Sequence, residues 1–119
     1  MVLYTAKQTR LFENHVALAF GLAYPDHRPE RGKVKIQIFT FFEIPRSASK
    51  NRRRAMELGD ELPTKRPDLL NIAAAICDGL NGIAYADDAQ ITELQAWKRY
   101  SDKPRTEVVI DFYQDGQGA

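Results

Sequence analysis

The chain has 119 residues, of which 44% are hydrophobic and 28% are charged, and these proportions are typical of one compact globular domain. Cys77 is the only cysteine, which excludes an intrachain disulfide and a cysteine-rich zinc site. The net charge of +1 hides local basic clusters of the kind found in nucleic-acid binders. The N-terminal residues lack the apolar core of a signal peptide, and no apolar run is long enough to cross a membrane. We therefore expect a cytoplasmic protein.

The first predicted element is a helix from about Ala6 to Leu22, where apolar residues recur at helical spacing. Thr5 and Gln8 have the spacing of a capping box at its start. A loop rich in proline and glycine follows the helix. Residues 33–42 then alternate between apolar and polar side chains, which predicts a strand whose second half is apolar on both faces.

Two helices of different character come next. Residues 47–58 predict a short, basic helix that ends at Gly59. Residues 69–80 predict an apolar helix that Asp68 can cap. The run of arginines in the first of these helices is either a solvated face or a DNA contact.

The last predicted elements are strands over residues 90–100 and 106–113, joined by a turn that contains Pro104. The order of helix, strand, helix, helix, strand, strand predicts a small α/β (α+β) domain, with a mixed or antiparallel sheet packed against helices. We expect residues 1–119 to form this single domain and residues 113–119 to be a disordered tail.

Aspartates stand at both ends of the apolar helix. Asp68 precedes it, and Asp87 and Asp88 precede the strand that follows. Carboxylates are preferred ligands of Mg²⁺, which can activate water for phosphodiester hydrolysis. The pattern predicts a metal site where the helix start and the strand start converge. A helix cap and a turn are the alternative interpretation.

Two segments, RPDLLNIAAAICDGLNGIAYADDAQI and KRYSDKPRTEVVI, resemble the RusA family of Holliday-junction resolvases. The upstream segments YTAKQTRLFE and SKNRRRAMELGDELPTKRPD resemble the family's first helix and basic segment, so the resemblance covers nearly the whole chain. The residues that match the central family pattern are Pro67, Asp68, Asn71, Asp78, Leu80, Asn81, Gly82, Tyr85, Asp87, Asp88, Gln90 and Ile91.

The resemblance implies a homodimeric endodeoxyribonuclease of bacterial or phage origin that depends on Mg²⁺, with Mn²⁺ as a substitute. Such an enzyme binds four-way-junction DNA and nicks two strands symmetrically during recombination and repair. The resemblance implies that Asp68 and Asp88 are catalytic and hold the metal, with a catalytic Asp87 beside them. The implied DNA-binding residues are Lys50, Arg52, Arg53, Arg54, Lys65 and Arg66.

The chain departs from the family pattern at the centre of this site. Leu70 stands where the family has a second aspartate, and Ala74 stands where it has a lysine. Residues four apart share a helix face, so we expect Leu70, Ala74 and Cys77 to form an apolar face. A leucine cannot bind Mg²⁺, so we expect impaired catalysis unless Glu93, Asp87 or a DNA phosphate replaces the missing ligand.

Two other functions fit the same sequence. One is a catalytically inactive module that binds junction DNA with the same fold. The other is a structural domain that uses the apolar helix as a dimer face. The resemblance also implies a strand and a basic loop before the first helix, and we expect this segment to lie upstream of this sequence or to be lost by truncation.

Overall fold

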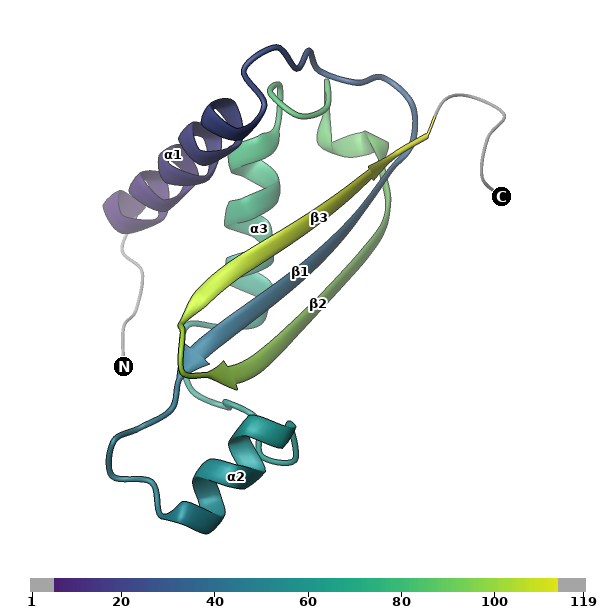
Figure 1. Ribbon diagram of the computed structural model, residues 1–119. Coiled ribbons are helices and arrows are strands. Elements are labelled where there is room, and N and C mark those ends of the chain that lie inside the picture. Colours follow the sequence, from purple (N-terminus) through teal and green to yellow (C-terminus); the bar gives the residue numbers. More distant parts are fainter. Residues whose placement is uncertain (1–5, 114–119) are drawn as a thin grey trace.

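The computed structural model describes residues 6–113, with side chains from residue 12 onward. The described elements follow the predicted order and form a small α+β domain (Figure 1). The capping box at Thr5 and the predicted tail after residue 113 lie outside the described residues. The elements are helix α1 (Ala6–Ala23), strand β1 (Val34–Glu43), helix α2 (Lys50–Leu58), helix α3 (Leu69–Leu80), 3-10 helix η1 (Asp88–Gln90), strand β2 (Ile91–Ser101) and strand β3 (Arg105–Phe112).

The helix ends follow from local hydrogen bonds. Ser49 caps α2, because its hydroxyl accepts a hydrogen bond from the backbone N–H of Arg52 at 3.2 Å. Gly59 ends α2 with a φ of 83°, a left-handed conformation that glycine adopts without strain. Helix α3 has the predicted bounds, and Gly82 after it also has a positive φ of 77°.

The sheet is mixed, with strand order β2-β1-β3. Strand β1 pairs in parallel with β2 and antiparallel with β3, so it is central (Figure 1). We call the face that carries Val34, Ile36 and Ile38 the inner face, because these three side chains are fully buried.

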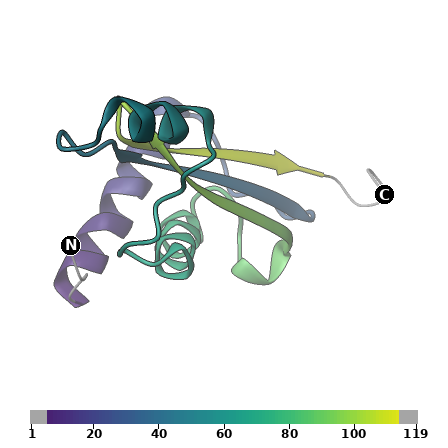
Figure 2. The ribbon, with the colours of Figure 1, turned by 90° about the horizontal axis from the view of Figure 1, so that it is seen from below.

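The inner face packs against α3, which supplies Ile72, Ile76 and Leu80 to the core. Tyr85, in the loop after α3, is fully buried, and its hydroxyl donates a hydrogen bond to the Cys77 carbonyl at 2.6 Å. Figure 1 shows α3 behind the strands, and Figure 2 shows α3 on one side of the sheet. The opposite, outer face of the sheet is the one that Figure 1 presents to the viewer.

Helix α1 approaches α3 closely at Gly79. A Cβ atom there would lie 2.7 Å from the Glu13 carbonyl oxygen and 3.1 Å from the Val16 Cβ. We expect Gly79→Ala to lower the melting temperature, because α1 must shift, at a cost of about 1–3 kcal/mol. This cost outweighs the helix-propensity gain of about 1 kcal/mol. Thermal unfolding followed by circular dichroism measures the difference.

Gly21→Ala is the matched control for this prediction. Gly21 also lies within a helix, but a Cβ atom there would meet nothing within 4 Å. The same substitution should therefore raise the melting temperature at Gly21 and lower it at Gly79. Equal shifts at both positions would contradict the packing described for α1 and α3.

Candidate functional site

The loop that joins α3 to β2 is fixed by hydrogen bonds from its own side chains. The Asp87 carboxylate accepts a hydrogen bond from the Ala89 N–H at 3.0 Å, and the Gln90 side-chain oxygen accepts one from the Asp87 N–H at 2.8 Å. These two bonds form a capping box for η1. The Gln90 amide group also donates to the carbonyls of Glu30 and Gly32, at 2.9 and 2.8 Å. Asp88 is therefore held in a defined position.

Asp88 lies partly buried at the carboxyl end of α3. Its Oδ1 atom is buried and has no hydrogen-bond partner among the described residues. Burial raises the pKa of the Asp88 carboxyl, and the negative charge of Asp78 raises it further. The side chain of Tyr85 lowers this pKa and so opposes the shift. An ionised carboxylate oxygen in such a position gains from a cation. The local chemistry therefore suits a metal ligand at Asp88.

Asp78 is a member of this acidic group that the sequence analysis did not assign to the site. It is exposed on α3, and its charge acts on both Asp88 and Cys77. The signal for it was present in the sequence, because Asp78 matches the RusA pattern.

Asp68 lies at the opposite end of α3. It occupies the N-cap position, but its side chain makes no capping hydrogen bond, so the predicted side-chain cap is wrong. The carboxylate instead pairs with the Arg66 guanidinium at 3.5 Å. Burial lowers the pKa of Lys98 on β2, and the nearby charge of Asp68 opposes that shift. Lys98 also donates to the Lys65 carbonyl at 2.6 Å, so this lysine is a second basic group at the start of α3.

The structure does not bring Asp68 and Asp88 together within one chain. Helix α3 has 12 residues, which corresponds to a length of about 18 Å. Asp68 precedes its first turn, whereas Asp88 lies close enough to Asp78, near its last turn, to feel the charge of that residue. Among the described residues, no three acidic, histidine or cysteine side chains are grouped so that they could hold a metal ion. The prediction that the start of α3 and the start of β2 converge on one metal site is therefore wrong for a single chain.

Leu70 and Ala74 lie on the exposed face of α3, and Leu70 is 84% exposed. Cys77 instead lies in the core. The prediction that it shares an apolar helix face with Leu70 and Ala74 is therefore wrong for Cys77. Burial and the nearby charges of Asp88 and Asp78 raise the pKa of the Cys77 thiol to about 11. The exposed face of α3 therefore consists of Leu70, Asn71, Ala74 and Asp78.

Glu93, the proposed substitute ligand, is engaged elsewhere. It pairs with Lys35 at 3.4 Å, next to a register shift between Val34 and Lys35. Lys35 points away from the inner face of β1, so this pair belongs to the outer face of the sheet.

The predicted DNA-binding residues gather on α2 and on the segment before α3. Arg52 pairs with Glu61 at 2.7 Å, and Arg53 pairs with Asp102 at 3.2 Å. Lys50 and Arg54 on α2 and Lys65 before α3 are exposed and have no ion pair among the described residues. The part of this set that is free to meet phosphates is therefore smaller than the sequence predicts.

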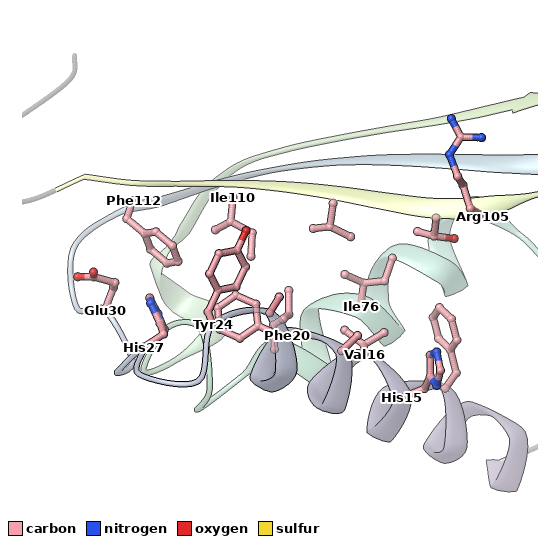
Figure 3. Close-up of a pocket in the computed structure, with 16 residues that line it drawn as sticks. His15, Val16, Phe20, Tyr24, His27, Glu30, Ile76, Arg105, Ile110 and Phe112 are labelled. Carbon is pink, nitrogen blue, oxygen red and sulfur yellow. The ribbon is translucent and has the colours of Figure 1, made fainter.

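A pocket of about 780 Å³ lies between α1, α3 and β3 (Figure 3). Its lining is mostly apolar, and His27 in its wall bonds to the Ala84 carbonyl at 2.9 Å. None of the predicted site residues lines it. The acidic and basic groups described above lie outside this pocket.

Comparisons with known proteins agree with the sequence resemblance. The family model described as endodeoxyribonuclease RusA matches residues 2–111. A protein of Bacillus subtilis (strain 168) described as "Uncharacterized protein YqaN" is 34% identical over 108 residues, which cover 87% of this chain and 73% of the relative. No solved structure matches the chain. None of the helices in residues 6–113 could span a membrane. The chain belongs to the RusA family of endodeoxyribonucleases.

Proposed function

We propose that this protein is a metal-dependent endonuclease that acts on four-way DNA junctions as a homodimer. In this proposal Asp68 and Asp88 would hold Mg²⁺ or Mn²⁺, and Asp87, which is adjacent to Asp88 in the chain, would assist them. The observation that carries the metal assignment is the buried Asp88 Oδ1 atom, which has no donor among the described residues. Membership of the RusA family supports DNA as the partner.

In this proposal the acidic residues bind the metal ion and the basic residues bind the DNA. A bound Mg²⁺ ion supplies an activated water and stabilises the charge that develops on the phosphate. Asp68 and Asp88 fix its position. Lys98 and the exposed Lys50, Arg54 and Lys65 hold DNA phosphates, so junction binding should weaken as the salt concentration rises.

A homodimer also accounts for the separation of the two aspartates. Since α3 keeps Asp68 and Asp88 apart in one chain, an ion that both residues bind has to lie between two chains. An antiparallel meeting of α3 with its copy places the start of one helix beside the end of the other. The exposed face with Leu70 and Ala74 is free for such a meeting.

The same face limits the chemistry. Leu70 and Ala74 provide neither the carboxylate nor the cation of the family pattern, so we propose that cleavage by this chain is impaired. A catalytically inactive module that binds junctions is the second candidate. The 84% exposure of Leu70 favours it, because an apolar side chain lies where a ligand would be needed.

Cleavage of a mobile four-way junction in Mg²⁺ or Mn²⁺ tests the proposal. We expect slow, paired nicks that fall at least about 100-fold in Asp88→Asn, because the neutral side chain is a poor ligand. Asp26→Asn, in an exposed loop, is the matched control and should cleave as the parent does. Junction binding without cleavage in either metal would reject the enzyme and establish the binding module.

A further inference from the structure

The outer face of the sheet carries a stacked aromatic pair at its centre. The register of β1 and β2 places Phe39 directly opposite Trp97. Their ring centroids are 4.7 Å apart, and the planes differ by 9°. Trp97 nevertheless remains 39% exposed, so Phe39 covers only part of the indole. The pair presents a flat aromatic surface to the solvent.

Arginines adjoin this aromatic pair on both edge strands. Arg99 on β2 and Arg105 on β3 are the register partners of Phe41, one step along the same face. The Arg105 guanidinium lies 4.1 Å from the centroid of the Phe41 ring. Arg105 also pairs with Glu107 at 2.6 Å, which offsets part of its charge.

Helix α2 extends this positive region beyond the strands. The Arg99 guanidinium lies against Gly59 at the end of α2 and leaves no room there for a Cβ atom. The Nε atom of Arg99 is buried and has no hydrogen-bond partner among the described residues. Arg99 thus joins β2 to the end of α2, a helix on which Lys50 and Arg54 are exposed.

We infer that the outer face binds unpaired nucleotides of single-stranded DNA, with a base stacked on Trp97 and phosphates held by Arg99, Arg105 and α2. Aromatic rings beside arginines are the combination that binds single strands, because every base has a flat face and every nucleotide carries a negative phosphate. Bases inside a duplex are already stacked and cannot use such a surface. The inference goes beyond the proposed nuclease site, because it uses none of the acidic residues, and it rests only on DNA as the partner.

A second copy of the chain fits this face less well. Polar contacts border the aromatic pair along the strands, namely a Gln37–Gln95 hydrogen bond of 3.0 Å and the ion pair of Lys35 with Glu93. The apolar area between these groups and the arginines consists of few side chains. A stable dimer buries about 800 Å² on each partner and is apolar at its centre. Arg99, which has no ion pair among the described residues, instead supplies a positive charge that complements a nucleic acid, while Glu107 offsets part of the charge of Arg105.

Trp97 is the only tryptophan of the chain, so its fluorescence reports on this face alone. The full chain is titrated with an oligothymidylate and, separately, with an abasic oligonucleotide of equal length and charge. We expect the oligothymidylate to quench the fluorescence and the abasic strand to leave it unchanged. Equal quenching by both strands would overturn the inference, because phosphates alone would then explain it.

Affinity for a labelled oligothymidylate, measured by fluorescence anisotropy, gives a second readout. We expect Trp97→Ala to weaken binding about tenfold and Trp97→Phe to restore most of it. Leu94→Ala is the matched control, because Leu94 is an exposed apolar residue of the same strand opposite Ile36 of the inner face. Unchanged affinity in Trp97→Ala would overturn the inference. So would a fluorescence shift that depends on protein concentration alone, since a second copy would then cover the face.

The result is separable from the proposed nuclease function. Cleavage that is lost in Asp88→Asn but persists in Trp97→Ala would support the nuclease whatever the oligonucleotide titrations show. Conversely, quenching by the oligothymidylate in a chain that cuts no junction would support the stacking surface alone.

Discussion

Replacing Leu70 by aspartate and Ala74 by lysine should raise the rate of junction cleavage about 100-fold, the usual effect of one well-placed electrostatic group. The two substitutions restore a metal ligand and a cation on one face of α3. Both positions are exposed, and Asp68 lies two residues before the first of them. The new groups would therefore lie close to Asp68 at the start of α3.

The double substitution should leave the fold intact. Leu70 is 84% exposed, so little buried apolar area is lost. An aspartate in the first turn of a helix is also favoured by the helix dipole. We expect the melting temperature of the variant to stay within a few degrees of the parent, as measured by circular dichroism.

A second double variant, Leu70→Asn with Ala74→Gln, is the control. It is polar at both positions but adds no charge, so it should not gain activity. Cleavage is measured on the same mobile junction in Mg²⁺ and in Mn²⁺. If the charged variant binds junctions and melts normally but cuts no faster than the control, the remaining site is not competent, and the binding module becomes the better proposal.

The sequence predicted the elements around this site well, because local signals determine them. Asp68 and Gly82 bracket α3, and the observed helix has the predicted bounds. The 3-10 helix η1 was not predicted, although the spacing of Asp87 and Gln90 was available to indicate a capping box. That short helix moves the start of β2 to Ile91, one residue later than predicted.

Contacts between distant segments could not be predicted from the sequence. The proximity of Lys98 to Asp68 depends on how β2 lies against the start of α3, and no local pattern encodes that contact. The stacking of Phe39 on Trp97 depends on the parallel register of β1 with β2, which is likewise a contact between distant segments. The separation of Asp68 from Asp88 depends on the length of α3 together with the loop after it, which the Tyr85 hydrogen bond to the Cys77 carbonyl holds at the carboxyl end of the helix. A 12-residue helix is too long for acids at its two ends to share one ion.

Mixing Asp68→Asn with Asp88→Asn should restore cleavage that neither variant has alone. If Asp68 of one chain and Asp88 of its partner form one site, a mixed dimer has one site with both substitutions and one site with neither. Random pairing then leaves roughly a quarter of all sites intact, because two-fold symmetry gives each dimer two equivalent sites. The mixture should nick one strand of a junction instead of making paired cuts.

Co-expression with two different affinity tags yields the mixed dimers, and sequential purification isolates them. Dimers that carry Asp68→Asn under both tags are the control and should stay inactive. If isolated mixed dimers bind junctions but never nick them, Asp68 and Asp88 do not act across two chains. Asp68 would then not be a metal ligand, and its role would be limited to its pairing with Arg66 and its proximity to Lys98.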